Sequence, residues 1–264
     1  MMAFAANSML ARLALRFTDI DAATFTAVRI GAGALVLAGI VALRRGRLLG
    51  SWASAAALFV YAAAFSFAYL ALATGTGALI LFGAVQITMI GAGLMAGERL
   101  NARQLVGMAL ALGGLVVLVA PGVEAPPLGA ALLMAASGAA WGVYSLRGRG
   151  ADDPVSASAG NFLRAVPFGL ALVTVIGLRG GLQLDATGLG YAVLSGAVTS
   201  GLGYVAWYAV LPALRASSAA TVQLSVPVLA ALGGVAFVAE PITLRLALAS
   251  VATLGGIALV LRAR

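Results

Sequence analysis

The sequence predicts an all-α integral membrane protein of ten transmembrane helices, built as two inverted five-helix repeats. Of the 264 residues, 62% are hydrophobic and only 9% are charged, whereas a water-soluble domain carries roughly a quarter charged residues. The chain also divides into apolar stretches separated by short turns, and motifs of its first half recur in its second half. These three observations are the basis of the predicted fold.

The apolar stretches are separated by Arg, Asp, Pro and Gly residues, and a span of the bilayer needs about 20 apolar residues. The stretches lie near residues 3–16, 24–43, 52–73, 75–97, 103–120, 127–146, 155–178, 187–210, 214–239 and 243–262. The first is too short to cross the hydrocarbon core, and Asn7, Ser8 and Arg12 dilute its apolar character. We therefore expect a shortened first helix.

Recurring motifs indicate a tandem duplication. In each half, a Glu precedes a pair of glycines at the same interval: Glu98 with Gly113 and Gly114, and Glu240 with Gly255 and Gly256. Three arginines also recur at a constant offset, as the pairs Arg12 and Arg147, Arg29 and Arg164, and Arg44 and Arg179. Each half has an odd number of spans, so the second copy is inverted in the bilayer. We place the repeats at residues 1–120 and 127–264, joined by a short Pro-rich turn.

The arginines in the short loops predict the orientation of the chain, because cytoplasmic loops carry an excess of positive residues. With a cytoplasmic N-terminus, ten arginines face the cytoplasm: Arg44, Arg45, Arg47, Arg99, Arg103, Arg147, Arg149, Arg215, Arg262 and Arg264. Four face the other side: Arg12, Arg16, Arg179 and Arg245. This count places both termini in the cytoplasm.

The composition excludes several classes of function. The chain has no His and no Cys, and all 16 of its basic residues are Arg. Without Lys there is no phosphate-loop lysine and no Schiff base, and without His or Cys there is no zinc protease or thiol enzyme. We therefore expect no enzyme, no cofactor and no metal site. The formal net charge of +8 comes from loop arginines, so we expect no nucleic-acid partner.

Arg29 and Arg164 are predicted to lie inside spans, at equivalent positions of the two repeats, whereas all eight carboxylates lie in loops or at span ends. Ionisable residues inside a membrane are costly and are often functional. Arg164 shares a helix face with Asn161, so the two can bind a carboxylate or phosphate of a substrate. Alternatively, each Arg ties its helix to neighbouring carbonyls or extends to the nearer interface, since Arg29 lies about two turns from Asp21.

Helical spacing places aromatic groups on one face of three predicted helices: Tyr61, Phe65 and Tyr69; Trp141 and Tyr144; and Tyr204 and Tyr208, with Trp207 beside them. Facing a central cavity, they would stack on an amphipathic metabolite or hydrogen-bond to it. The alternative is an interfacial belt, which suits Tyr69 and Tyr208 near helix ends but not Tyr61 in mid-span.

Three amides, Asn7, Gln86 and Gln223, interrupt otherwise apolar spans. Pro227, four residues after Gln223, frees backbone carbonyls and kinks its helix. Hydrogen bonding between helices explains any one amide as well as ligand binding does. Together with the aromatic residues and the two arginines, the amides predict the lining of a cavity.

Each predicted half has an aromatic third helix, a small-residue fourth helix, a Glu at the next turn and a Gly-Gly pair in the fifth. In this arrangement of helices and motifs the chain resembles the EamA-like family of the drug/metabolite transporter superfamily. The segments that carry the resemblance are 74–100 and 217–242, the second with Pro227 and Glu240. The chain departs from the family pattern at Val85, where a Pro is typical, and in its shorter first helix.

The resemblance implies export or exchange of small organic metabolites or drugs across the bacterial inner membrane, by alternating access. It places seven residues in the substrate cavity: Asn7, Tyr61, Gln86, Trp141, Tyr204, Trp207 and Gln223. It favours a structural or gating role for Arg29 and Arg164, and we assign the same kind of role to Glu98, Pro227 and Glu240. The expected partners are a small-molecule substrate and the lipid bilayer, with a homodimer left open.

Two other hypotheses remain. An intramembrane enzyme would need Ser and Tyr to act unaided, because no His, Cys, Lys or carboxylate is predicted inside a span. A non-transporting scaffold, which only binds a partner or lipid, is the alternative that a shortened first helix would favour.

Overall fold

The computed structural model describes residues 1–97, 101–122, 124–149, 151–210 and 223–262, and every regular element in these ranges is a helix. The elements are α1 (Met2–Phe17), α2 (Ala22–Leu43), α3 (Trp52–Tyr69), α4 (Thr74–Met95), α5 (Ala102–Val119), α6 (Leu128–Arg147), α7 (Pro154–Gly177), α8 (Ala186–Leu194), η1 (Ser195–Leu202), α9 (Gly203–Val210), α11 (Ser225–Val238) and α12 (Leu244–Arg262). Because α8, the π-helical η1 and α9 follow one another without a break, they form one continuous rod.

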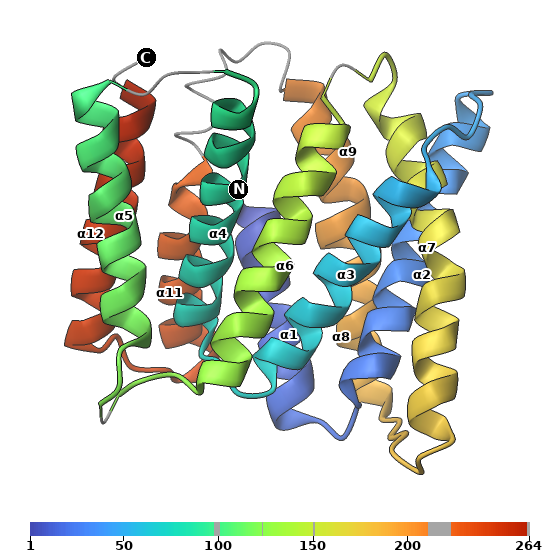
Figure 1. Ribbon diagram of the computed structural model, residues 1–264. Coiled ribbons are helices and arrows are strands. Elements are labelled where there is room, and N and C mark those ends of the chain that lie inside the picture. The colour runs from blue at the N-terminus through green and yellow to red at the C-terminus, as the bar shows by residue number, and fades with distance from the viewer. Residues whose placement is uncertain (98–100, 123, 150, 211–222, 263–264) are drawn as a thin grey trace.

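Eight helical stretches among the described residues are long and apolar enough to cross a membrane. The two shorter helices are α1, with 16 residues, and α11, with 14 residues. In Figure 1, α1 begins at mid-height in the bundle and runs down to the lower end. The predicted class of an all-helical chain with many apolar spans is therefore confirmed.

The helices run between two ends of the molecule, which are the top and the bottom of Figure 1. Helices α1 and α6, which occupy equivalent places in the predicted repeats, run in opposite directions between these ends. The top is here called the Arg-rich end, because it carries the arginines at the end of α6 and in the turns that follow α2 and α6: Arg44, Arg45, Arg47, Arg147 and Arg149. The opposite end carries most of the described carboxylates: Asp19, Asp21, Glu124, Asp185 and Glu240.

Helices of the two predicted repeats interleave. The most extensive packing joins α5 to α12, α2 to α7 and α3 to α6, so each of these pairs takes one helix from each half. Helices α5 and α12 lie side by side at one edge of the bundle (Figure 1). Their backbones approach closely because Gly107 on α5 faces the carbonyl of Gly256 on α12, which is how small residues pack membrane helices.

The outer surface of the bundle is apolar. Leu35, Val116, Leu170, Phe237 and Val251 are among its exposed side chains. Large apolar side chains exposed around a whole bundle are expected when lipid, and not water, surrounds it. The buried core, by contrast, includes many small residues and several polar side chains.

Asp side chains begin several helices by capping free backbone N–H groups. Asp21 accepts hydrogen bonds from the backbone N–H of Ala23 and of Thr24, each 2.9 Å long. Asp153 caps α7 in the same way, and hydrogen bonds from the side chain and backbone of Ser156 hold the pKa of this carboxyl below its usual value. Aspartate in the loops therefore marks where helices start.

Candidate functional site

A cavity of about 240 Å³ lies between α1, α3, α4, α6 and α9. Its lining runs from Asn7 and Ser8, deep in the bundle, to Gly148 and the exposed Arg149 in the turn that follows α6. Because that turn belongs to the Arg-rich end, the cavity reaches this end of the molecule.

All seven residues that were predicted to bind substrate line this cavity: Asn7, Tyr61, Gln86, Trp141, Tyr204, Trp207 and Gln223. They come from five helices and from the segment before α11. The sequence did not single out several others that share the lining, among them Phe4, Ser8, Met89, Ser145 and Arg149. Phe4 and Ser8 belong to the same face of α1 as Asn7, so helical spacing from Asn7 is the signal that would have indicated them.

Trp141 is at the centre of the aromatic wall. Its ring centre lies 4.8 Å from that of Tyr61 and 5.3 Å from that of Tyr204, with both ring pairs tilted. Phe4 contacts Tyr204 edge-on at 6.0 Å and Trp207 at 6.4 Å. Such a wall presents apolar ring faces to a ligand together with hydroxyl and indole hydrogen-bond donors.

The deep end of the cavity is polar, and residues of both halves contact its lining residue Asn7. The side-chain oxygen of Asn7 accepts hydrogen bonds from Ser195 Oγ at 2.6 Å and from Thr199 Oγ1 at 3.2 Å. The Asn7 amide nitrogen donates to the Tyr61 hydroxyl at 3.5 Å. Ser195 and Thr199 lie in η1, and π-helical turns of this kind frequently occur at functional sites.

The two arginines that were predicted inside spans have different surroundings. Arg29 is 2% exposed and lies behind Tyr61, whose hydroxyl accepts a 2.8 Å hydrogen bond from Arg29 Nη2. Arg164 donates to the backbone carbonyls of Leu49 and Gly160, at 2.8 and 2.9 Å, and does not line the cavity. The geometry of Arg164 thus matches the structural alternative, while Arg29 adjoins the cavity wall.

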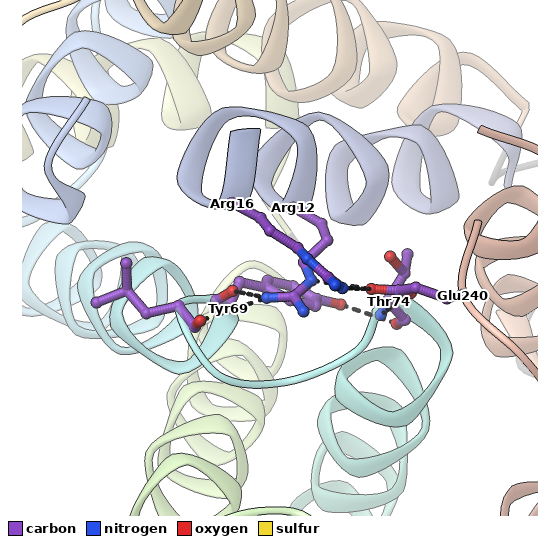
Figure 2. A network of polar contacts seen from close by, with 6 residues as sticks. Arg12, Arg16, Tyr69, Thr74 and Glu240 are labelled. Carbon is purple, nitrogen blue, oxygen red and sulfur yellow. Dashed lines mark hydrogen bonds and ion pairs between the residues drawn. The ribbon is translucent and has the colours of Figure 1, made fainter. Parts of the chain in front are cut away.

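A network of buried polar groups, here called the Arg12–Glu240 network, joins α1, the turn between α3 and α4, and Glu240 (Figure 2). Arg12 Nε donates to Glu240 Oε1 at 2.9 Å, and Arg12 Nη1 donates to the backbone carbonyl of Tyr69, also at 2.9 Å. Arg16 Nη1 lies 3.8 Å from the same carboxylate. On α1, Arg12 is one helical turn beyond Ser8 of the cavity lining, and on α3, Tyr69 is one turn beyond Phe65.

Both charges of the pair also sit at helix ends where the helix dipole favours them. Glu240 Oε2 accepts a 2.7 Å hydrogen bond from the backbone N–H of Thr74, the first residue of α4. The residue that precedes it, Ala73, has no side chain that can cap the helix. Arg12, in turn, donates to the carbonyls of the last turn of α3. The second half of the chain thus supplies the N-terminal cap of a first-half helix.

This network corrects the predicted exposure of Arg12, excludes the interfacial alternative for Tyr69 and shows that Glu240 is buried at its span end. Arg12 was predicted to face the aqueous side opposite the cytoplasm, but it is 7% exposed and paired inside the bundle. Glu240 does lie at a span end as predicted, yet it is equally buried, so the position of a carboxylate in the sequence did not indicate its burial. Tyr69 does not belong to an interfacial belt, because it is fully buried and donates to the carbonyl of Thr74 at 3.2 Å.

Arg147, the repeat counterpart of Arg12, has different contacts. Its Nε donates to Ser54 Oγ at 3.1 Å, and its Nη2 lies 3.5 Å from Ser51 Oγ. Both serines lie at the start of α3, at the Arg-rich end. No carboxylate of the described residues lies within ion-pair distance of Arg147.

Of the two remaining residues with a predicted gating role, the structure describes Pro227 but not Glu98. Pro227 lies in the first turn of α11, and the helix break is at Leu224, the residue before α11 begins. Proline has no N–H to donate, so the carbonyl of Gln223 is left without the usual helical partner. Glu98 lies outside the described residues. Among the residues that are described, there is no cluster of three His, Cys, Asp or Glu that could hold a metal ion.

Comparison with known proteins supports the family that the sequence indicated. Uncharacterized protein PA1977 of Pseudomonas aeruginosa is 58% identical to this chain over an alignment that covers 100% of this chain and 92% of that protein. A protein of known crystal structure shares the fold, with a TM-score of 0.67 and 20% identity over 98% of this chain and 96% of that one. The sequence pattern of the EamA-like transporter family matches residues 128–262, about half of the chain. The chain is therefore a multi-pass membrane protein that belongs to the EamA-like transporter family, a family of transporters and not of enzymes.

Proposed function

We propose that the protein transports small organic metabolites or drugs by alternating access between two inverted five-helix repeats. The observation that carries this proposal is the cavity, which reaches the Arg-rich end at Arg149. One helical turn beyond its deep end, the buried ion pair of Arg12 and Glu240 lies between the cavity and the opposite end of the molecule. A binding site accessible from one end and sealed at the other is what one state of such a transporter requires.

The arrangement of the helices supports an inverted repeat of ten membrane-spanning segments. Helices α1 and α6, which have equivalent places in the duplicated sequence, run in opposite directions (Figure 1). The packing is also reciprocal: the third segment, α3, packs on α6, and the eighth, formed by α8 and η1, packs on α1. Reciprocal contacts are expected when two inverted copies are related by a pseudo-two-fold axis in the membrane plane.

The Arg12–Glu240 network has the properties of a reversible gate. It joins α1 and the α3–α4 turn of the first repeat to Glu240, two positions after the end of α11 in the second repeat. A buried ion pair loses about as much hydration energy as it gains from attraction. Water that enters when the two charges separate restores their hydration, so the pair can open and close at small net cost.

We place the chain in the bacterial inner membrane with the Arg-rich end, where α12 ends (Figure 1), in the cytoplasm, following the loop arginines. In this orientation the cavity faces the cytoplasm and the Arg12–Glu240 network closes the periplasmic side. An efflux protein, or an exchanger, would take up its substrate from the cytoplasm in this state.

Exchange of radiolabelled solutes by the protein in proteoliposomes tests this function, with a panel of organic acids, amino acids, nucleosides and quaternary ammonium compounds. We expect exchange of at least one of them. Tyr61→Ala and Gln223→Ala should each lower its rate at least about tenfold, the effect of losing about 1.4 kcal/mol of binding energy. Phe237→Ala, on the outer surface, is the matched control and should leave the rate unchanged. If no solute exchanges, the scaffold alternative is favoured.

The gate is tested separately by the access of reagents to the cavity. The chain has no cysteine, so Ser8→Cys introduces a single thiol at the deep end of the cavity. In inside-out vesicles this thiol should react with a membrane-impermeant maleimide faster than in right-side-out vesicles. Adding Glu240→Gln to this variant should raise the rate at which the thiol reacts in right-side-out vesicles, because the end opposite the Arg-rich end then opens more readily. If the Ser8→Cys variant without Glu240→Gln reacts with the maleimide at equal rates in both kinds of vesicle, the proposed gate is contradicted.

A further inference from the structure

Arg29 is a buried cation whose charge is not neutralised by any carboxylate that the structure describes. Its side chain contacts the Ser200 hydroxyl, the Tyr61 hydroxyl and two aromatic rings, and its Nη1 has no hydrogen-bond partner. Among the described residues, the only ion pairs are those that Glu240 forms with Arg12 and Arg16. A buried charge without a counter-ion is unfavourable, so a missing anion is the natural partner of Arg29.

Arg29 acts on the cavity through the residues that line it. Its guanidinium carbon lies 5.1 Å from the ring centre of Tyr61 and 4.8 Å from that of Phe65, and both rings belong to the lining. The Tyr61 oxygen accepts from Arg29 at 2.8 Å and from Asn7 at 3.5 Å, and no described residue accepts its own proton. That proton is therefore available to an acceptor atom inside the cavity.

None of the described residues that line the cavity is an Asp or a Glu, while Arg149 stands at its mouth. Those lining residues therefore offer a ligand cation no carboxylate to pair with. Aromatic rings can also bind cations, but Arg29 already lies over two of the rings at the deep end. A second cation there would be repelled, whereas an anion would be attracted from both ends of the cavity.

The size and walls of the cavity limit the body of such a ligand. Its volume of about 240 Å³ exceeds the roughly 150 Å³ that holds a benzene molecule in an apolar protein cavity. Trp141, Tyr204 and Phe4 supply ring faces and edges against which a planar group can pack. One ring with a short acidic side chain fits this space.

We propose that the cavity takes a small planar organic anion that lacks a cationic group, with its carboxylate at the Tyr61 hydroxyl and its ring against Trp141. This proposal rests on the transport function proposed above and names the substrate class of the same site. It separates simple organic acids from amino acids, whose ammonium group would have no carboxylate partner among the lining residues.

The test uses four probes with one phenyl ring and different head groups: phenylacetate, phenylacetamide, phenethylamine and phenylalanine. The chain has three tryptophans, of which Trp141 and Trp207 line the cavity while Trp52 is 59% exposed on the surface. In a Trp52→Phe background, tryptophan fluorescence therefore reports on the cavity alone. Calorimetric titration of the purified protein provides an independent affinity.

We expect phenylacetate to bind at least about tenfold more tightly than each of the other three probes, since opposite charges about 8 Å apart interact appreciably at an effective dielectric of about 20. Arg29→Gln should abolish this preference while leaving the affinity for phenylacetamide unchanged, and Arg29→Lys should retain part of it. If Arg29→Gln does not fold, Tyr61→Phe provides the second test, because it removes the hydroxyl donor but keeps the ring. It should lower the affinity for phenylacetate relative to phenylacetamide.

Equal or tighter binding of the amide, the amine or phenylalanine would overturn the anion proposal and leave the transport function intact. Failure of all four probes to bind would also overturn it, because a ring-bearing acid is the smallest ligand that the proposal describes. Solute exchange in proteoliposomes, which does not depend on these probes, decides the transport function separately.

Discussion

At the scale of single residues, the pair of Arg12 and Glu240 joins the two halves of the chain most directly. Each partner is buried, and each also bonds to a backbone group at a helix end. Removing one partner leaves the other charge buried without its counter-ion, which costs more than the pair contributes.

Arg12→Gln and Glu240→Gln should therefore each lower the free energy of unfolding by about 3 kcal/mol or more. The double variant Arg12→Leu with Glu240→Leu should lose less than the sum of the two single losses, because it leaves no unpaired charge. Unfolding of the purified protein by titration with a denaturing detergent measures all three variants. Strictly additive losses would show that the two side chains do not interact.

The sequence indicated the residues of the cavity lining better than those of this network. Helical spacing found Tyr61 and Trp141 because aromatic side chains that face a cavity repeat along one side of a helix. Arg12 and Glu240 are 228 positions apart, and their contact depends on how the two halves fold together. No local pattern contains that information, so the burial of both charges became visible only in the structure.

At the scale of helices, the two Gly-Gly pairs of the duplicated motif explain how α5 and α12 pack. A Cβ at Gly114 would lie 2.8 Å from the backbone nitrogen of Thr253, and one at Gly256 would lie 2.6 Å from that of Ala111. The first glycine of each pair, Gly113 or Gly255, has no atom within 4 Å of its Cβ position. Each pair thus contains one packed glycine and one open one.

Gly114→Ala and Gly256→Ala should each destabilise the protein by about 1–3 kcal/mol, because the added methyl group meets backbone and not a movable side chain. Gly113→Ala and Gly255→Ala are the matched controls and should leave stability unchanged or raise it by up to about 1 kcal/mol, since Ala favours the helix. Thermal unfolding in detergent compares the four variants. Similar behaviour of both members of a pair would mean that α5 and α12 are not in close contact.

The sequence located most helices because apolar length and the residues between the spans are local signals. It did not indicate the π-helical η1, in which Ser195 and Thr199 donate to Asn7 and Gly196 lies close to the backbone of Arg29. It placed the break near Pro227, and the structure puts it at Leu224. Tertiary contacts, and not local propensity, decide these details.

At the scale of the whole molecule, the distribution of charge predicts how the chain sits in the membrane. The turns at the Arg-rich end carry the cluster of arginines that follows α2, whereas most of the described carboxylates lie at the opposite end (Figure 1). Excess positive charge marks the cytoplasmic side. The sequence predicted the uneven distribution of the arginines, because successive loops lie alternately at the two ends, but it did not predict on which side most of the carboxylates lie.

Single cysteines at exposed positions of opposite ends test this orientation. Leu48→Cys lies at the Arg-rich end and Leu182→Cys at the other end, and neither substitution changes the number of charges. In intact cells, a membrane-impermeant maleimide should label Leu182→Cys and spare Leu48→Cys, and permeabilised cells should label both. The reverse pattern would place the Arg-rich end outside.

The contacts of Arg12 and of its counterpart Arg147 have a consequence for the other state of the molecule. The same residue of a duplicated sequence is paired with a carboxylate at the sealed end and with serine hydroxyls at the end that the cavity reaches. If the two halves are inverted copies, as proposed above, the structure shows the same residue in two different surroundings. The opposite state follows if each half takes the shape that the other half has now, so the end near Arg147 draws together as the end near Arg12 separates.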